Sequence, residues 1–411
     1  MTRVVIVGGG FAGTAVARAL GRDAEVVLVS DRNYLLFTPM LAEVAAADID
    51  PRHILTPLRQ LCPHARVVIG TAVRVDPRRR SVDVRSPVDG SITTYPGEAL
   101  VLAAGGEQAT YGVPGVVDNA LMFKTISDAL TIRTRLITLF EDSTERPDPL
   151  LTRVIVVGAG YSGAELAASL ADFMRRAARR YYREAPTPSV WLVDAVDRVV
   201  PMLPPEASAA AARALARRGV ELVLGHRVTA VDPGVVVLDD GSRLEASTIV
   251  WAGGVVGRDL PPGLDIEPEK AGRYAVDERL HLSEGVWVLG DLAIVPDGRG
   301  GLCPPTAQHA IRQGAYLGEH LPAMLAGKPT PAFEYRSMGE LVALGHRNAV
   351  GRVLGFTVSG FLAWLLWRSY YLLRLPTLLR KVRVAIDWGL DLVFPPDVTD
   401  PATAPRGPGL E

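Results

Sequence analysis

The hydrophobic pattern begins with a short apolar run at the N-terminus. Residues 4–7 are all β-branched, which is typical of a strand buried on both faces. The run leads into the spacing Gly8-x-Gly10-x-x-Gly13, and the alanine-rich residues 12–20 that follow predict a helix. In such a unit the first glycine permits a tight turn, the second lets the backbone approach a pyrophosphate, and the third lets helix and strand pack closely. The pattern predicts a dinucleotide site at the helix N-terminus.

The same pattern occurs a second time in the chain. An apolar strand at residues 153–157 precedes Gly158-x-Gly160-x-x-Gly163 and a second helix. Each unit continues into a further strand, at residues 25–30 and 190–194. Two such fingerprints predict an α/β fold with two Rossmann-like dinucleotide-binding domains. Two dinucleotide sites are explained most simply by one nicotinamide dinucleotide and one flavin dinucleotide.

The second strand of each unit is expected to end near an acid that hydrogen-bonds a ribose. Asp194 stands at the end of its strand, and a carboxylate there favours NADH because it would repel a 2′-phosphate. In the first unit Ser30 ends the strand and Asp31 follows one position later. We assign Asp31 to the ribose, with Ser30 sharing the contact, and a turn-forming Asp31 is the alternative.

The rest of the pattern predicts strands joined by short turns and one further helix. Asp89-Gly90 and Asp240-Gly241 mark hairpins, and residues 99–106 and 249–254 read as buried strands that run into glycine. A strand is expected after Glu284, with Asp291 at its C-terminal end, and a helix is expected at about 306–321. The polar, proline-containing residues 141–149 predict a linker or loop at a domain boundary.

Composition narrows the functional classes. The chain has 411 residues, of which 48% are hydrophobic and 22% charged, enough for two or three domains and too polar for a polytopic membrane protein. A net charge of -1 gives no reason to expect nucleic acid as a partner. Cys62 and Cys303 are the only cysteines, which argues against a disulfide framework or a cysteine-ligated metal, and no metal site is predicted. No signal peptide precedes the first strand, so the bulk of the protein is expected in the cytoplasm.

The C-terminal part predicts contact with a membrane surface. Residues 353–367 are apolar and uncharged, but fifteen residues are short of the roughly twenty that span a bilayer. No acid occurs between Glu340 and Asp387, whereas arginines alternate there with tryptophan, tyrosine and leucine. This pattern predicts a helix in the interface of an anionic membrane, and a buried dimer interface is the alternative. Residues 401–411 predict a disordered tail.

The motifs together resemble those of the type II NADH dehydrogenases, single-chain NADH:quinone oxidoreductases among the two-dinucleotide-binding-domain flavoproteins. The likeness covers essentially the whole chain. The segments that carry it are residues 4–13, 33–40, 111–115, 156–167, 288–291, 304–314 and the apolar stretch 359–367.

The resemblance implies FAD on the first fingerprint and NADH on the second. It implies a FAD domain in two parts, 1–120 and 266–330, an inserted NAD domain, 121–265, and an attachment or dimerisation segment, 331–411. It also implies a membrane quinone (menaquinone or ubiquinone) as acceptor, an anionic lipid surface and a second copy as partners, and a peripheral place on the cytoplasmic face of the cell membrane. The implied cofactor-binding residues are Gly8, Gly10, Gly13, Ser30, Asp31, Thr38, Pro39, Ala104, Gly105, Asp291, Ala307, Gly158, Gly160, Gly163, Asp194 and Gly254.

Three residues are candidates for the chemistry. Glu165 follows the second fingerprint, where it either complements the helix dipole or, as the resemblance implies, lies beside the nicotinamide and flavin. Gln308 and Gln313 belong to the segment that the resemblance places near the quinone. Arg312 stands where the family usually has glutamine, so it either alters the quinone site or extends to solvent; it shares a helix face with Gln308.

The remaining chemistry-bearing residues read as structural. Cys303 precedes the helix at 306, whose N-terminus could lower its thiol pKa, but no cysteine pair has redox spacing. His309 and His346 are isolated, and Tyr181-Tyr182 in an arginine-rich segment reads as a solvated helix face. The alternative functions are a flavin reductase with another acceptor, of the sulfide:quinone or soluble-carrier type, and a non-catalytic NADH-binding flavoprotein.

Overall fold

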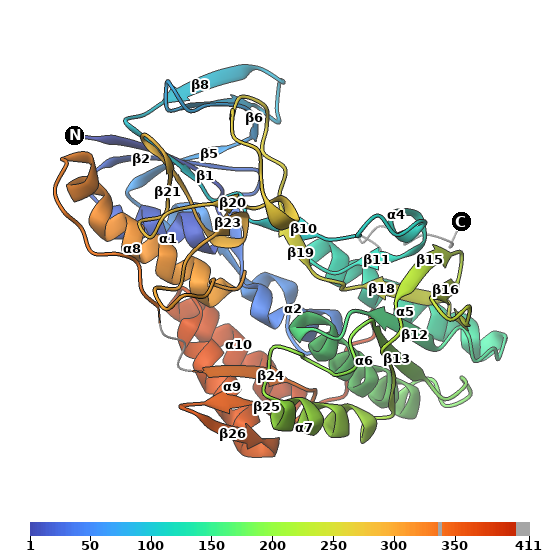
Figure 1. The fold of residues 1–411 in the computed structure, drawn as a ribbon. Coiled ribbons are helices and arrows are strands. Elements are labelled where there is room, and N and C mark those ends of the chain that lie inside the picture. Colours follow the sequence, from blue (N-terminus) through green and yellow to red (C-terminus); the bar gives the residue numbers. More distant parts are fainter. Residues whose placement is uncertain (336–338, 400–411) are drawn as a thin grey trace. The chain divides into compact units, whose positions relative to one another are not determined.

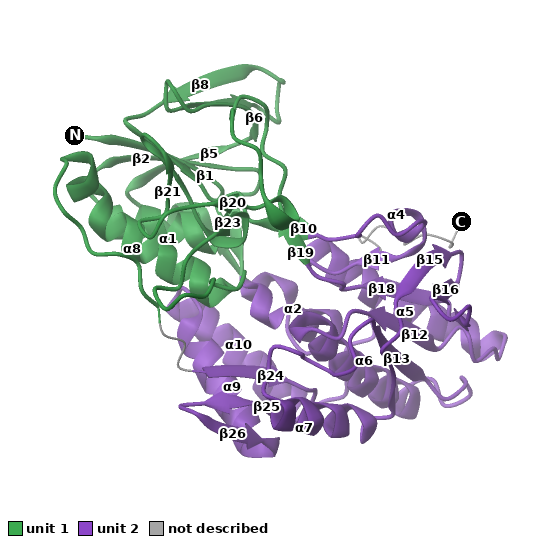
Figure 2. Cartoon of the chain, viewed as in Figure 1, with its two compact units in different colours: residues 1–36, 55–107, 255–336 green, residues 37–54, 108–254, 337–411 purple. Residues whose placement is uncertain are grey.

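The computed structural model describes residues 1–335 and 339–399, which form two compact units (Figure 2). The first unit holds residues 1–36, 55–107 and 255–336, and the second holds residues 37–54, 108–254 and 337–411. The chain changes unit after residues 36, 54, 107 and 254, and residues 339–399 belong to the second unit. The predicted tail at 401–411 lies outside the described residues.

A six-stranded sheet forms the centre of the first unit (Figure 1). All neighbouring strands are parallel except β21, which runs antiparallel to β22. The central strands are buried, as their continuous apolar runs require. In order the strands are β21 (His281–Ser283), β22 (Val286–Val288), β9 (Ala99–Leu102), β1 (Arg3–Val7), β2 (Glu25–Ser30) and β5 (Ala65–Ile69).

Two helices of the first unit, α1 (Phe11–Leu20) and α8 (Ala307–Leu325), pack tightly against each other. Small residues allow this approach, because a Cβ on Gly318 would lie 2.5 Å from the Ala19 Cβ and 2.8 Å from the Val16 carbonyl oxygen. The other elements are β3 (Tyr34–Leu36), β4 (Leu55–Pro57), α3 (Leu58–Leu61), β6 (Thr71–Asp76), β7 (Ser81–Arg85), β8 (Ile92–Pro96), β10 (Gly106–Gln108), β19 (Val255–Gly257), η3 (Lys270–Gly272), β20 (Tyr274–Ala275), η4 (Gly290–Leu292) and β23 (Ala293–Ile294).

The second unit is built on a five-stranded, wholly parallel sheet. Its strands in order are β11 (Leu121–Met122), β18 (Thr248–Trp251), β12 (Arg153–Val157), β13 (Ser189–Asp194) and β14 (Val220–Leu224). The elements that accompany this sheet are α4 (Val116–Asn119), α5 (Ile126–Glu145), α6 (Tyr161–Arg180), α7 (Pro205–Ala216), β15 (Val228–Asp232), β16 (Val235–Leu238) and β17 (Arg243–Glu245). Both predicted hairpins, β7–β8 and β16–β17, are present.

Two further segments complete the second unit. Residues 37–54 form η1 (Thr38–Met40), α2 (Leu41–Ala45) and η2 (Pro51–Ile54). The C-terminal part forms β24 (Gly339–Ala343), β25 (Ala349–Val353), β26 (Phe356–Ser359), α9 (Gly360–Arg374) and α10 (Leu378–Asp391). Within the described ranges, no helix has both the length and the apolar character that crossing a membrane requires.

The structure corrects three local predictions. Residues 141–145 are the last turn of α5, not a linker, because Phe140 and Ser143 are buried there. Tyr182 is not solvated: it is 5% exposed, stacks on Phe140 and donates to Glu141 over 2.7 Å. The apolar run 353–367 is not one helix, since β26 interrupts it before α9 begins at Gly360.

Candidate functional site

The first fingerprint has the cradle that the glycine spacing predicts. Gly8 has a φ of 119°, and a Cβ on it would overlap the Ala103 carbonyl oxygen. A Cβ on Gly13 would overlap the carbonyl oxygen of Gly8, so helix and strand touch there. Gly10 faces open space within 4 Å and is the N-cap of α1. The cradle therefore fits a dinucleotide pyrophosphate at the helix N-terminus.

The other predicted residues of the first unit gather at the carboxyl ends of adjacent strands. β1 ends before Gly8, β2 ends on Ser30, and β9 ends shortly before Ala104 and Gly105. Open parallel sheets bind ligands at this edge. Asp31 is exposed and accepts from Arg258 over 3.2 Å, while the Ser30 hydroxyl is buried and accepts from the Arg32 amide. Ser30 and Asp31 thus present different environments to a ribose.

Asp291 and the start of α8 join the same edge. β22 lies beside β9, and Asp291 follows it in η4. A Cβ on Gly290 would lie 3.2 Å from the Ala12 Cβ and 3.7 Å from the Ala310 Cβ, so the N-terminal turns of α1 and α8 meet there. Thr306 caps α8, and Ala307 is its first residue. The positive ends of two helices are therefore brought to one place.

The two candidate glutamines of α8 have different environments. Gln313 is 2% exposed, and its Oε1 accepts from the Gly290 amide over 2.8 Å, which fixes α8 to η4. Gln308 accepts from the Tyr335 hydroxyl over 3.2 Å. The Arg312 guanidinium lies 5.6 Å from the centre of the same Tyr335 ring, which confirms that Gln308 and Arg312 share a helix face. Tyr335 was not singled out in the sequence.

The second fingerprint repeats the geometry of the first. Gly158 has a φ of 109°, a Cβ on Gly163 would overlap the Gly158 carbonyl oxygen, and Gly160 again faces open space. Asp194 ends β13, and its carboxylate accepts from the backbone amides of Ala159 and Val196. Gly254 follows β18 with a φ of 117°. The predicted residues of this unit also share the carboxyl edge of adjacent strands, and they fit a second dinucleotide.

Glu165 is partly buried in α6, one residue beyond its first turn. Its Oε1 accepts from the Ala343 amide over 3.1 Å. Loss of water around the carboxyl raises the pKa of Glu165 to about 8, and the negative charge of Glu43 adds to this rise, against the lowering effect of the hydrogen bond from the Ala343 amide. A carboxyl that stays protonated near neutral pH is suited to proton transfer, and dipole complementarity does not explain its burial.

A second acid, Glu43 on α2, was missed by the sequence reasoning. It is 8% exposed, and its Oε1 accepts from the Trp388 indole over 3.1 Å and lies 3.7 Å from Arg368. Burial raises the pKa of Glu43 to about 8 despite Arg368. Arg368 itself lies between the rings of Trp364 and Trp388, at 4.0 and 4.5 Å from their centres. Arg368 therefore does not belong to the predicted membrane-facing charges.

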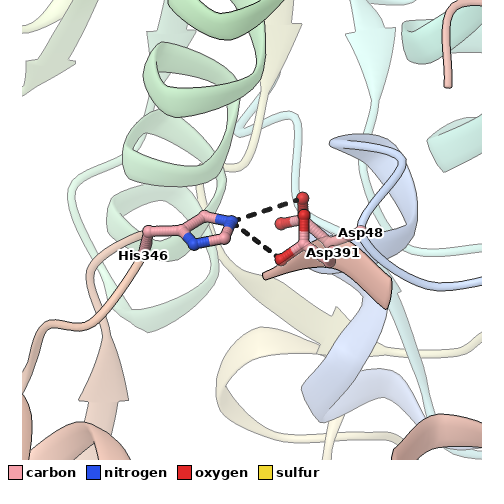
Figure 3. A group of neighbouring side chains, drawn as sticks. All are labelled: Asp48, His346 and Asp391. Carbon is pink, nitrogen blue, oxygen red and sulfur yellow. Dashed lines mark ion pairs between the residues drawn. The ribbon is translucent and has the colours of Figure 1, made fainter. Parts of the chain in front are cut away.

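Asp48, His346 and Asp391 form a compact group in the second unit (Figure 3). His346 Nε2 lies 2.8 Å from an Asp391 oxygen and 3.8 Å from an Asp48 oxygen, so His346 is not isolated as predicted. An Arg176 nitrogen lies 2.8 Å from Asp391 and 3.4 Å from Asp48. Since this guanidinium already supplies a cation to both carboxylates, we do not assign a metal to the group.

The two cysteines, His309 and the implied cofactor-binding residues Thr38 and Pro39 are the remaining residues considered in the sequence analysis. Cys62 and Cys303 are buried free thiols; burial raises the pKa of Cys303 and raises that of Cys62 to about 11, so the expected lowering at Cys303 is wrong. His309 is buried beside Thr306, in agreement with a structural role. Thr38 and Pro39 lie in η1 of the second unit.

Comparisons with known proteins agree with this geometry. The family model for pyridine nucleotide-disulphide oxidoreductases matches residues 2–314. The chain is 33% identical to a type II NADH:quinone oxidoreductase of Mycobacterium tuberculosis, over 94% of this chain and 87% of that protein. It is 29% identical to a demethylphylloquinone reductase of Synechocystis, over 94% and 95%. NDH2 of Plasmodium falciparum, solved with NADH, has the same fold, with a TM-score of 0.88, 18% identity and 97% and 99% coverage.

Proposed function

Because the chain belongs to the type II NADH:quinone oxidoreductases, within the pyridine nucleotide-disulphide oxidoreductase family, we propose that its two fingerprints divide the cofactors between the two units. The enzyme oxidises NADH and reduces a quinone, with FAD as its cofactor. FAD supplies the two-electron redox centre between donor and acceptor. In the proposal the first cradle holds the FAD pyrophosphate and the second holds NADH.

The observation that carries this proposal is the doubled cradle, with a carboxylate at the expected strand end in the second unit. Asp194 is placed to accept from ribose hydroxyls and to disfavour a 2′-phosphate. Asp291 and the first turn of α8 hold the remainder of FAD in the first unit, and Ala307 is part of that turn. The two buried thiols do not favour the cysteine-pair chemistry of the sulfide alternative, since burial raises the pKa of each and each contacts a different backbone carbonyl.

We assign Glu165 to proton handling beside the reacting nicotinamide. The variant Glu165→Gln keeps the shape and the hydrogen bond from Ala343 but cannot release a proton. It is expected to slow NADH:quinone turnover by about tenfold or more, with FAD content unchanged. Steady-state rates and the flavin absorbance of the purified variant measure both quantities. An unchanged rate would remove the assignment.

We assign Gln308 to the quinone, with Tyr335 and Arg312 beside it. Its side chain is half-buried, and the amide remains a donor for a quinone carbonyl because only its oxygen accepts from Tyr335. Gln313 supports the site indirectly, since its oxygen is used by the Gly290 amide. Gln308→Leu is expected to raise the KM for quinone and leave the KM for NADH unchanged. Equal changes in both constants would contradict the assignment.

The C-terminal helices are proposed to bind the surface of an anionic membrane. One side of α9 and α10 packs into the second unit through Trp364, Trp367, Val384 and Trp388. Exposed apolar side chains cover the remaining surface, with Arg374, Lys381 and Arg383 among them. The exposed apolar side chains on these helices and just after α10 include Phe361, Leu362, Leu365, Leu373, Leu378, Leu379, Val382, Ile386, Leu390 and Phe394. The cytoplasmic leaflet supplies the negative charge that such a surface requires.

Cosedimentation with anionic vesicles tests this surface. Deleting the helices would also remove Arg368 and Trp388 from the core of the unit, so we choose Leu373→Ser, Leu378→Ser and Val382→Ser together. This variant is expected to lose most vesicle binding, whereas Val88→Ser with Ile92→Ser, on an exposed hairpin of the first unit, is expected to retain it. Undiminished binding by the triple variant would contradict membrane attachment. If sedimentation instead shows that the oligomeric mass of the triple variant differs from that of the wild type, the same surface is the interface of the proposed homodimer.

A further inference from the structure

We propose that Glu43 carries protons in this enzyme, receiving them from water through Asp48, His346 and Asp391 and passing them toward Glu165. The inference rests on the proposed role of Glu165 and names the route that refills it. All five residues belong to the second unit, and their placement follows from the packing of three helices, α2, α10 and α6.

The first of these elements is α2 with the turn that ends it. Glu43 lies inside α2, and the Asp48 amide donates to the Glu43 carbonyl over 2.8 Å, so the chain folds back immediately after the helix. Ala47, with a φ of 60°, makes this tight reversal possible. The reversal holds the two acidic residues on one short, rigid segment.

The second element, α10, runs past both acids. Trp388 and Asp391 are three residues apart and therefore share a helix face. Trp388 donates to Glu43 over 3.1 Å, and Asp391 shares His346 and Arg176 with Asp48. One face of α10 thus contacts the inner acid through Trp388 and joins the outer group through Asp391, which orders the residues from surface to interior.

The outer group has contact with water. The side chains of Asp48 and Asp391 are only 10% and 6% exposed, whereas those of His346 and Arg176 are 23% and 25% exposed. Partial burial would lower the pKa of His346, but Asp391 and Asp48 outweigh it and raise that pKa to about 9. Burial raises the pKa of Asp48 to about 6. A histidine partly open to solvent beside a carboxyl that binds protons near neutral pH is a suitable place for proton uptake.

The inner end consists of Glu43 and Glu165. α2 packs against α6, which carries Glu165, and the negative charge of Glu43 raises the pKa of Glu165. Helix α9 lies near both acids, because Arg368 is 3.7 Å from Glu43 and its neighbour Trp367 is among the groups that affect the pKa of Glu165. Glu43 Oε2 has no hydrogen-bond partner among residues 1–335 and 339–399. This oxygen is available to give or receive a proton.

Burial is the main cause that keeps a proton on Glu43. The Arg368 charge lowers the pKa of Glu43, and the negative charges of Asp48 and Asp391 offset part of that effect. The neighbouring ionisable groups of Glu165 are Glu43, Tyr161 and Tyr371. The titratable and charged groups that face the two glutamates are Asp48, Asp391, Arg368, Tyr161, Tyr371, Glu340, His346 and Arg176.

The reaction needs such a supply. Its balance is NADH + H⁺ + quinone giving NAD⁺ + quinol, so two electrons and one hydrogen come from NADH and one proton comes from water. In each turnover an O–H bond of a carboxyl breaks as an O–H bond of the quinol forms. The carboxylate left behind regains a proton from Glu43, Glu43 regains one from the group of Asp48, His346 and Asp391, and that group regains one from solvent.

The test compares Glu43→Gln with the wild type and with Glu221→Gln, an exposed control on β14 of the same unit. Wild-type kcat with quinone is expected to fall as the pH rises through about 8, where Glu43 loses its proton. Glu43→Gln is expected to turn over about tenfold or more slowly at pH 7. Its rate is also expected to start falling at a lower pH than in the wild type, because the charge of Glu43 no longer raises the pKa of Glu165, while the control follows the wild type. A wild-type kcat and pH profile in Glu43→Gln would overturn the proposal.

Two further measurements separate proton transfer from structural damage. Infrared difference spectra of the protein are expected to show carboxylic-acid carbonyl absorption from Glu43 and Glu165 that disappears above about pH 8, and the Glu43 part of it is expected to be missing in Glu43→Gln. His346→Gln is expected to slow turnover and to recover rate when imidazole is added, which a structural defect would not do. A missing band in the wild type, or a slow His346→Gln that imidazole does not accelerate, would count against the route. If the wild type itself reduces no quinone, the failure belongs to the proposed function.

Discussion

Two glycines of the second fingerprint are expected to fail in different ways when changed to alanine. At Gly163 the new Cβ would overlap the Gly158 carbonyl oxygen and lie 2.9 Å from the Gly158 carbonyl carbon. Such overpacking costs about 1–3 kcal/mol, partly offset by the helix propensity of alanine, which is worth about 1 kcal/mol. A net loss of up to about 2 kcal/mol lowers the melting temperature by up to roughly 8 °C. Thermal unfolding without NADH measures this shift.

Gly160→Ala is the matched partner of that variant. Gly160 has a φ of -70° and open space around it, so alanine fits the unliganded protein. A methyl group there stands where the pyrophosphate approaches the backbone, so the KM for NADH is expected to rise about tenfold or more, with the melting temperature nearly unchanged. Steady-state kinetics at saturating quinone, with flavin content as control, give this constant. An unchanged KM for NADH in Gly160→Ala would refute the assignment of this cradle to the nucleotide.

Three other outcomes follow from the same contacts. Asp194→Asn is expected to reduce the preference for NADH over NADPH, measured as the ratio of kcat/KM values, because the charge that repels a 2′-phosphate is gone; an unchanged ratio would contradict the role of Asp194. Because burial raises the pKa of Glu43 from 4.5 to about 8, the unfolded chain binds fewer protons between these values, so the stability contributed by this group falls as the pH rises from 5 to 8. Glu43→Gln is therefore expected to gain melting temperature relative to the wild type over that range, and a constant difference would show that Glu43 is ionised in the folded protein. Arg368→Met is expected to raise the pKa of Glu43 further, which the infrared band would report as a shift of its disappearance to higher pH.

The sequence predicts those parts of the fold that depend on local chemistry. Each fingerprint appears where the glycine spacing places it, because a backbone contact such as Gly13 against Gly8 admits no other residue. The family resemblance is likewise confirmed by the matched relatives. The segment 141–145 was misread because its polar composition outweighed the burial of Ser143, which the pattern does not show.

The acidic interior could not be predicted from local pattern. Glu43 is the only charged residue in the apolar stretch 40–47, which is a signal in itself. Its environment, however, comes from Arg368 and Trp388, more than 300 residues later in the chain. His346 is isolated in sequence for the same reason, since Asp48 and Asp391 reach it only through tertiary packing. Arg368 was assigned to the membrane surface because its sequence neighbours are apolar. In the structure Arg368 is instead buried.

The most direct test of the enzyme as described here is the stoichiometry of its reaction. Purified protein is mixed with NADH and a soluble quinone analogue without oxygen, and NADH loss, quinol formation and proton uptake are followed together. We expect each turnover to consume one NADH, form one quinol and take up one proton. We also expect a much lower rate with NADPH. NADH oxidation that does not depend on quinone, or an equal rate with NADPH, would contradict both the acceptor and the assignment of Asp194.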